Sequence, residues 1–390
     1  MKIGIITFHF AYNCGAVLQC LALSEKLNQM GHEVCVINYQ PWYHKNRYTP
    51  LKNPVYYSKK RATSRGEGDS VRRQFLRGAK GFASVVYSWR HYPKVNKIDK
   101  YFKDFAKNNL NETCIYRTFD QLVNNPPKCD LYISGSDQLW NAKLTEGKID
   151  PAYLLEFGSS DIRKITYSMG VSLKNMEEPV ESIKPSLMKF DAISLREEEC
   201  YKQIHELTEG KVDMHVDVDP TFLLKKEEYD KYIPEESLCD EPFIFTYTMP
   251  DSSQMKVYNA AKELSNKLGI KVIDASGNPK NANKKIEDNR ICGPAQFLWY
   301  IKNADYVVTN SFHGTAFSVN MEKNFVTIPH SQTGYRVTEI LDKLGLNNRY
   351  AYTGADAVEC FNTKADFEKS SAILDSLREE SIKYLEKQTK

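Results

Sequence analysis

The chain opens with the run KIGIITFHFAYNCGAVLQCLALSEKLNQMGHEVCVIN at residues 2–38. The apolar start, residues 2–7, predicts a strand, and apolar residues at near-helical spacing predict a helix over 15–30 that Gly31 ends. Residues 32–38 are the next expected strand. This β-loop-α-β order is typical of a Rossmann-like fold. The loop at residues 8–15 contains a single glycine, so it lacks the glycine pattern of dinucleotide sites.

Short apolar strands alternate with helix-period segments along the rest of the chain, which indicates α/β layers with parallel sheets. Further strands are expected at 131–134, 164–168, 192–195, 214–216, 243–247, 271–273, 306–309 and 325–328. Further helices are expected at 182–190, 197–209, 253–268, 294–303, 315–321 and 334–344. We therefore predict two Rossmann-like domains that face a cleft, residues 1–222 and 223–390, and a long helix at about 364–387.

The composition excludes several classes of protein. Of 390 residues, 41% are hydrophobic and 26% are charged, and no apolar run approaches the roughly 20 residues of a membrane span. The chain enters a strand at once and shows no secretion signal, so we expect a cytoplasmic protein. Nine cysteines without C-x-x-C spacing and eight histidines without paired spacing favour neither a disulfide framework nor a metal site.

Small polar residues follow the strand expected at 131–134, at the edge where parallel sheets bind ligands. They are Gly135, Ser136, Asp137 and Gln138. Such a turn exposes backbone N–H groups to an anion, and Asp137 is a candidate general base toward a sugar hydroxyl. The alternative is that Asp137 only caps a following helix.

Two later loops carry cations and a histidine. Arg196 follows the strand at 192–195; its guanidinium suits a carboxylate or phosphate, or it pairs with the adjacent glutamates. In the run 309–315, a strand leads into a turn and a helix N-terminus, which binds anions. His313 lies in that turn, where its charge is tunable near neutral pH. Arg336, near a later helix start, is a second anion-binding candidate or an exposed surface residue.

Five motifs together resemble the polysaccharide pyruvyl transferase family. They are Asn13-x-Gly15-Ala16-x-Leu18-Gln19, Gly135-Ser136-Asp137-Gln138-x-Trp140-Asn141, Ser194-x-Arg196-Glu197, Asp219-Pro220-Thr221 and Asn310-Ser311-x-His313-Gly314. The similarity spans about residues 1–345 in the family's order. It leaves out the segment 41–98, which we interpret as an insertion, and the terminal helix.

The resemblance implies a GT-B-like fold and transfer of a pyruvyl group from phosphoenolpyruvate to a sugar as a ketal, without a metal or further cofactor. It implies that His313 is catalytic and that Arg196 binds the donor. Family members often carry an arginine where this chain has Ser311, and Arg336 is our candidate for the missing cation. The remaining candidates for substrate binding are Asn13, Gly135, Ser136, Gln138, Ser311, Gly314 and Thr315, with the acceptor on the first domain and the donor on the second.

The insertion, residues 41–98, contains fourteen lysines and arginines against two acids, whereas the whole chain carries a net charge of only +3. Its aromatic residues are Trp42, Tyr43, Tyr48, Tyr56, Tyr57, Phe75, Tyr87, Trp89 and Tyr92. Nucleic acid is one interpretation. We favour peripheral contact with an anionic membrane face, where a lipid-linked sugar acceptor would lie, and expect no nucleic acid. A solvated arm or a sugar-binding lid remains open.

Two other functions remain open. A GT-B glycosyltransferase that uses a nucleotide sugar would have the same fold. A non-catalytic module that binds carbohydrate or docks on a membrane would show no turnover.

Overall fold

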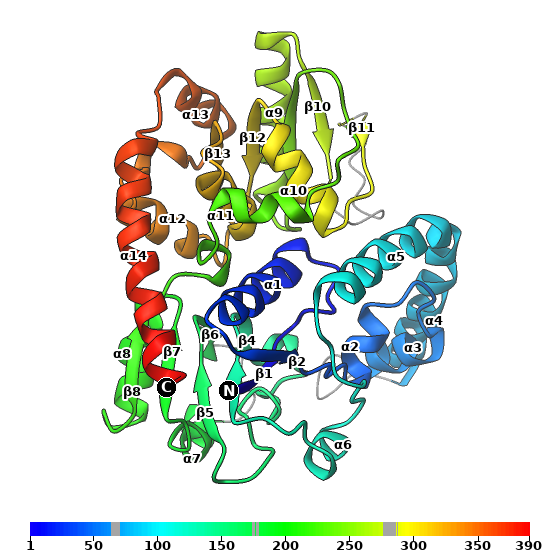
Figure 1. Ribbon diagram of the computed structural model, residues 1–390. Helices are drawn as coiled ribbons and strands as arrows, with labels where there is room; N and C mark the ends of the chain where they lie inside the picture. The colour runs from blue at the N-terminus through cyan, green and yellow to red at the C-terminus, as the bar shows by residue number, and fades with distance from the viewer. Residues whose placement is uncertain (64–70, 174–175, 177–178, 276–285, 287) are drawn as a thin grey trace.

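Two parallel sheets form the framework of the molecule (Figure 1). The computed structural model describes residues 1–63, 71–173, 176, 179–275, 286 and 288–390. The first sheet has the order β2-β1-β3-β5-β7-β6-β4, with β8 paired to β7, and the second has the order β11-β10-β9-β12-β13. The strands of the first sheet are β1 (Lys2–Ile6), β2 (Glu33–Val36), β3 (Leu131–Ser134), β4 (Asp137–Asn141), β5 (Arg163–Thr166), β6 (Met169–Ser172), β7 (Ala192–Leu195) and β8 (Asp213–Val216). Those of the second are β9 (Phe243–Tyr247), β10 (Lys271–Asp274), β11 (Asp288–Asn289), β12 (Tyr306–Thr309) and β13 (Phe325–Thr327).

Helices cover both sheets and fill the space between them (Figure 1). Those outside the insertion are α1 (Cys14–Gln29), α6 (Phe119–Asn124), α7 (Lys184–Leu187), α8 (Glu198–Leu207), α9 (Gln254–Leu268), α10 (Pro294–Asn303), α11 (Phe312–Asn320), α12 (Tyr335–Lys343), α13 (Gly354–Glu359) and α14 (Phe367–Gln388). Helix α1 packs against α10 and α11 of the second domain. Its Leu21 and Leu27 belong to one buried apolar cluster with Phe297 and Phe317, so the two domains share part of their core.

The architecture confirms the expected α/β fold with two Rossmann-like sheets. It differs locally from the sequence expectation at residues 137–141, which form the strand β4 directly after β3 rather than leading into a helix. Helix α11 begins at Phe312, three residues before the expected start, because Ser311 caps it. None of the described helices is both long enough and apolar enough to cross a bilayer.

The terminal helix α14 runs from the second domain to the first (Figure 1). Near its start, the hydroxyl of Ser371 donates to Glu322 of the second domain over 3.0 Å. Near its end, Tyr384 donates to the carbonyl of Thr166, and Ser381 accepts from the backbone of Val218. The predicted second domain, residues 223–390, includes this helix, but the last turns of α14 lie on the first sheet.

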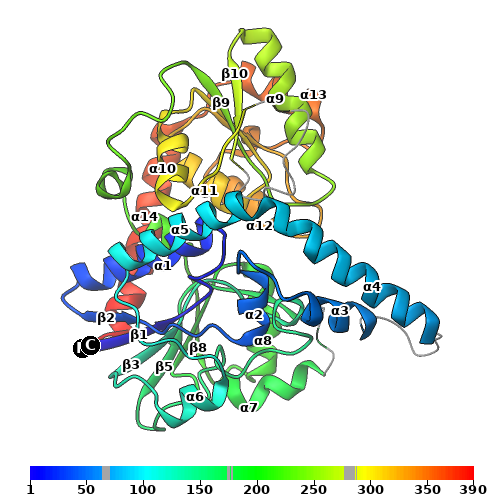
Figure 2. The same ribbon diagram turned by 90° about the vertical axis from the view of Figure 1, so that its right-hand side faces the viewer.

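The described part of the insertion is mainly helical. It comprises α2 (Trp42–Arg47), α3 (Pro54–Thr63), α4 (Val71–Ser88) and the start of α5 (Tyr92–Asn109). Helices α3 and α4 pack together as a hairpin that projects from the body of the molecule (Figure 2). The expected end of the insertion at residue 98 falls inside α5, whose Phe102 and Phe105 join the shared core. Helix α5 therefore anchors the end of this segment to the body of the molecule, from which the hairpin projects.

Candidate active site

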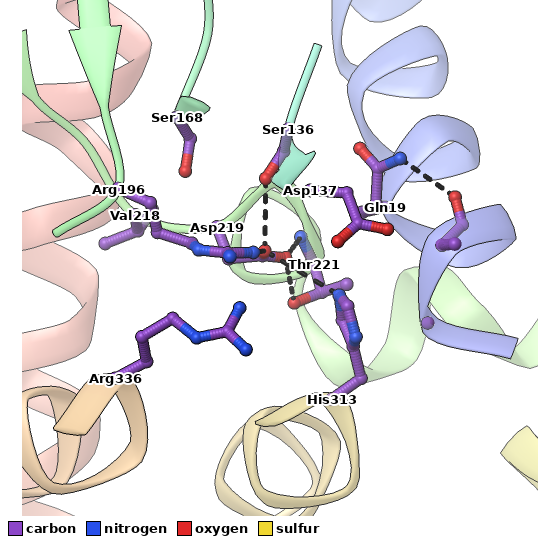
Figure 3. A network of polar contacts seen from close by, with 12 residues as sticks. Gln19, Ser136, Asp137, Ser168, Arg196, Val218, Asp219, Thr221, His313 and Arg336 are labelled. Atoms are coloured by element: carbon purple, nitrogen blue, oxygen red, sulfur yellow. Dashed lines mark hydrogen bonds and ion pairs between the residues drawn. The ribbon is translucent and has the colours of Figure 1, made fainter. Parts of the chain in front are cut away.

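A cluster of charged side chains lies between the two domains (Figure 3). The first domain supplies residues that follow the carboxyl ends of β3, β7 and β8. The second domain supplies His313 from the first turn of α11 and Arg336 from the first turn of α12. Because parallel strands end at one edge of a sheet, chain segments far apart in sequence meet here.

Asp219 is the centre of this cluster and is only 2% exposed. Its Oδ2 accepts from Nη1 of Arg196 at 2.9 Å and from the hydroxyl of Ser136 at 3.3 Å, while Oδ1 accepts from the backbone and hydroxyl of Thr221. Burial acts to raise the pKa of Asp219, yet its pKa is lowered, because His313 when protonated, the charge of Arg196 and the hydrogen bonds from Thr221 favour the carboxylate. Asp219 is thus an ionised anchor for the residues around it.

Arg196 is held by two carboxylates. Besides its bond to Asp219, its Nε donates to Glu197 over 2.9 Å, and all three side chains are almost completely buried. Burial acts to lower the pKa of Arg196, but the charges of Glu197 and Asp219 outweigh it and raise the pKa. Pairing with an adjacent glutamate, one of the two interpretations from sequence, is therefore present. The Nη2 atom of Arg196 is nevertheless buried without a hydrogen-bond partner among the described residues.

Arg336 approaches Arg196 from the second domain. Both guanidinium groups lie over the ring of Phe312, with their central carbons 5.8 and 4.7 Å from its centroid. The Nε of Arg336 is 3.8 Å from Glu197. Burial and the neighbouring charge of Arg196 lower the pKa of Arg336. Two buried cations at such close quarters form an arrangement that an anion would stabilise.

His313 lies against the start of α1 and is 6% exposed. A Cβ atom at Gly15 would overlap its imidazole ring, so glycine is required there. Its Nε2 is 3.8 Å from Oδ2 of Asp219 and has no hydrogen-bond partner among the described residues. Burial lowers the pKa of His313 and outweighs the charges of Asp219 and Asp137, which act to raise it. The ring is thus neutral at pH 7 and enclosed between the domains.

Asp137 begins β4 with a φ of 79°, in the left-handed region that non-glycine residues seldom adopt. Its carboxylate accepts the N–H of Gln138 at 2.8 Å and lies on the side of the cluster nearest His313 and Gln19 (Figure 3). The charge of Asp137 acts on both His313 and Arg196. Asp137 caps no helix, so the alternative interpretation from sequence does not hold.

The other candidate residues surround the cluster but make internal bonds. Asn13 and Ser311 accept backbone N–H groups at the starts of α1 and α11. Thr315 is fully buried, and its hydroxyl bonds within the second domain to Ser311 and Thr327. These three side chains therefore position the two helix N-termini.

The glycines and Gln138 have similar local roles. Gly135 donates to the carbonyl of Ile6, and a Cβ at Gly314 would meet the side chain of Thr309. Gln138 is partly exposed and accepts from Asn141 at 3.1 Å. Ser136 is the one member of its loop that bonds directly to Asp219.

Sequence reasoning did not list Asp219, Glu197 and Phe312 as site residues. Asp219 follows the end of β8 and precedes a proline, the same post-strand position that singled out Arg196. That position was the available signal. The sequence contains no comparable signal for Phe312, because only the approach of α11 to the first sheet brings its ring beneath both arginines.

The cavity at the cluster is small. It has a volume of about 30 Å³ and is lined by Arg196, Glu197, Asp219, Phe312 and Arg336 among others. That is space for roughly one or two water molecules. In this closed arrangement, a larger ligand would have to separate the guanidinium groups from their carboxylates or move the domains apart. In the part of the chain that the structure describes, no three histidine, cysteine or acidic side chains gather as metal ligands.

Solved structures are similar to this chain at low sequence identity. A putative UDP-N-acetylglucosamine 2-epimerase from Listeria monocytogenes is 10% identical, with a TM-score of 0.52 over 97% of this chain and 91% of that one. The UDP-GlcNAc 2-epimerase from Methanocaldococcus jannaschii, in complex with UDP-GlcNAc and UDP, is 12% identical with a TM-score of 0.48 over 97% and 99%. UGT89C1 from Arabidopsis thaliana is 12% identical with a TM-score of 0.38 over 98% and 94%. The fold and its inter-domain site define a GT-B-like protein.

The family follows from the sequence itself. The model of the polysaccharide pyruvyl transferase family matches residues 13–332, which include every residue of the charged cluster except Arg336. This chain therefore belongs to the polysaccharide pyruvyl transferase family, whose members are transferases of polysaccharide biosynthesis. No curated protein matches it.

Proposed function

We propose that this protein transfers the enolpyruvyl group of phosphoenolpyruvate to a sugar of a lipid-linked polysaccharide precursor, giving a pyruvate ketal and phosphate. The observation that carries the proposal is the meeting of His313 with Arg196, Arg336 and Asp219 between the two domains. Family membership supports pyruvyl transfer to a sugar. Phosphoenolpyruvate as the donor follows from the family resemblance, and the charges of the site suit it.

Phosphoenolpyruvate carries a carboxylate and a phosphate, and the site offers two guanidinium groups for them. Arg196, whose Nη2 has no hydrogen-bond partner among the described residues, and Arg336 both line the small cavity. When the donor binds, one of its anionic groups replaces Glu197 on Arg336, and the cavity widens by movement of the second domain. Bidentate pairs with arginine are the usual way in which proteins bind such groups.

His313 then supplies the proton that the reaction needs. It is neutral before binding, but a bound anion within 4–6 Å favours the imidazolium and raises the pKa of His313. The imidazolium protonates the methylene carbon C3 and leaves an oxocarbenium-like C2. General acid catalysis of this kind contributes about 10²- to 10⁴-fold to a rate.

Two hydroxyl groups of the sugar complete the ketal. The first attacks C2 while Asp137 accepts its proton, and this forms one C–O bond. The second attacks the same carbon, the bond from C2 to the phosphate oxygen breaks, and the second proton leaves with phosphate. In the overall balance, one hydroxyl proton makes up for the proton that His313 gave to C3, and the other hydroxyl proton ends on phosphate.

The exposed face of α4 supports the proposal that the acceptor sugar is linked to a lipid. Val71, Phe75, Phe82 and Val86 fall on one helical face, and the first two are 82% and 74% exposed. Gly78 and Gly81 on the neighbouring face pack against α3, and Lys80 is exposed. An amphipathic, basic helix of this kind suits the surface of an anionic bilayer. We propose peripheral contact with the cytoplasmic membrane face through the hairpin of α3 and α4.

The direct experiment measures phosphate release from phosphoenolpyruvate with a panel of lipid-linked and activated sugars. A gain in acceptor mass equal to one pyruvyl group identifies the product. If a nucleotide sugar is consumed instead and phosphoenolpyruvate is not, the protein is a glycosyltransferase and the proposal fails.

A further inference from the structure

A second and larger cavity lies in the first domain, beside the charged cluster. It has a volume of about 470 Å³ and opens at the carboxyl edge of β1 and β2. Helix α5 forms one wall of it, and α5 also packs against α10 of the second domain. A volume of this size is typical of sites for small ligands, roughly 300 to 1,000 Å³.

Aromatic rings line the inner part of this cavity. Tyr12, Tyr48 and Phe102 are close neighbours, with the ring centroid of Tyr12 5.7 Å from each of the other two. The hydroxyl of Tyr12 donates to Asp99 at 2.6 Å. Aromatic faces combined with a few fixed polar groups are the usual surroundings of a sugar ring.

Cations line the outer part. Lys45, Lys103, Lys107 and Arg117 contribute to the lining, against the two acids Asp99 and Glu112. Both acids are occupied, since Asp99 pairs with Lys103 at 2.7 Å and Glu112 lies 2.8 Å from Nε2 of His9. Among the described residues, Lys45 and Lys107 make no ion pair, and Lys45 lies 4.6 Å over the ring of Trp42. Positive charge therefore remains uncompensated at the rim.

The inner end of the cavity is connected to the charged cluster through the loop that precedes α1. Tyr12 stands three residues before Gly15, on which the ring of His313 rests. Burial chiefly raises the pKa of Tyr48, and the charge of Asp137 adds to this effect. The inner end of the cavity therefore lies on the side of the first domain that carries Gly15 and Asp137.

We propose that this cavity binds a saccharide that carries a phosphate or diphosphate group, with a sugar on Tyr12 and Tyr48 and the phosphate between Lys45 and Lys107. The inference deepens the proposed function, because the bound saccharide is then the acceptor. Two sources share this chemistry, a prenyl-diphosphate-linked saccharide and a nucleoside diphosphate sugar. The exposed apolar face of α4 in the same insertion favours the prenyl-linked form.

Calorimetric titration of the full-length protein tests the inference without turnover. The probes are a disaccharide on a short, soluble prenyl diphosphate, a UDP-sugar, and the same disaccharide without phosphate. We expect the phosphate-free disaccharide to bind at least about tenfold more weakly than one of the two phosphate-bearing probes, since charge-assisted bonds are lost. The phosphate-bearing probe that binds more tightly shows whether the natural ligand is prenyl-linked or a nucleotide sugar. Equal binding of all three probes, or binding of none, overturns the proposal.

Substitutions of residues that line the cavity test whether the ligand binds there. The double variant Lys45→Ala/Lys107→Ala removes two exposed side chains, and it should weaken binding of the phosphate-bearing probe about tenfold. Lys100→Ala, an exposed lysine on α5 outside the cavity, is the matched control and should bind as the wild type does. Tight binding by the double variant would contradict the inference even if phosphoenolpyruvate is turned over. If the wild type does not turn over phosphoenolpyruvate but the probes and variants bind as expected, only the proposed function is refuted.

Discussion

The imidazole of His313 in the second domain rests directly on Gly15 in the first, at the start of α1. No side chain fits between them, because a Cβ atom at Gly15 would overlap the ring. The candidate acid is thus positioned by the other domain, and the charged cluster exists only when the two sheets are together.

Gly15→Ala should therefore displace His313 and separate the domains locally. We expect a loss of about 1–3 kcal/mol in the free energy of unfolding, the usual cost of overpacking, together with a large fall in kcat. Denaturant unfolding and the phosphate-release assay measure the two effects. Gly354→Ala is the control, because a Cβ there meets its nearest neighbour at an ordinary 3.5 Å. A Gly15→Ala variant as active as this control would show that the contact is unimportant.

Asp219→Asn should destabilise the protein strongly. The change leaves Arg196 buried with one carboxylate partner instead of two, and breaking a buried pair costs about 3–5 kcal/mol. Glu206→Gln is the comparison, since its partner Lys202 is 86% exposed and such pairs contribute little. Equal midpoints for both variants in urea unfolding would contradict the central role of Asp219.

Donor binding should draw a proton into the site. Burial lowers the pKa of His313 below its usual value of 6.5, so the ring is neutral at pH 7, and a bound anion raises the pKa. Calorimetric titration of phosphoenolpyruvate at pH 7, in buffers of different ionisation enthalpy, should show proton uptake that His313→Asn lacks. Identical proton uptake by both proteins would exclude His313 as its source.

The same lowered pKa has a consequence for stability. The folded protein binds fewer protons at His313 than the unfolded chain does between the lowered pKa and 6.5, so stability contributed by this residue rises with pH across that window. Below it, the buried ring must become charged and the contribution is lost. His313→Asn should flatten the profile of unfolding free energy against pH in this window, and an unchanged slope would contradict the assignment.

Membrane contact through α4 should depend on both charge and apolar surface. The double variant Phe75→Ala/Phe82→Ala should weaken co-sedimentation with phosphatidylglycerol vesicles by tenfold or more, since burying each ring is worth about 1.5–3 kcal/mol. Binding of the wild type should fall as salt is raised and be weak on neutral phosphatidylcholine vesicles. Tyr352→Ala, which removes a ring that is 61% exposed on the second domain, is the control. Binding that is unchanged by salt and by the loss of both phenylalanines would refute membrane contact.

Much of the fold could be predicted from sequence because its strands are short, apolar and followed by turn residues. The strand at residues 306–309 and the helix at 294–303 agree to the residue. Strand β4 was missed, since a polar start with Asp137 at positive φ resembles a turn. The packing of α14 on the first sheet also gave no signal, because an amphipathic helix does not specify which surface its apolar face covers.

The site was predictable where position alone decides it. Arg196, Asp137 and His313 all follow strand ends, and the structure brings them around one point. Their partners depend on side-chain packing. Whether Thr315 faces the cleft or the core of its own domain is set by a hydrogen bond to Thr327, which spacing does not indicate. The enclosure of His313 likewise arises from the contact between domains.

The most direct test of the account is the rate of phosphate release from phosphoenolpyruvate, with a lipid-linked sugar acceptor, by the wild type and by His313→Ala. The account predicts turnover by the wild type with a matching pyruvyl gain in acceptor mass, and a loss of about 10²- to 10⁴-fold in kcat for the variant. Equal phosphate release by the two folded proteins would contradict it.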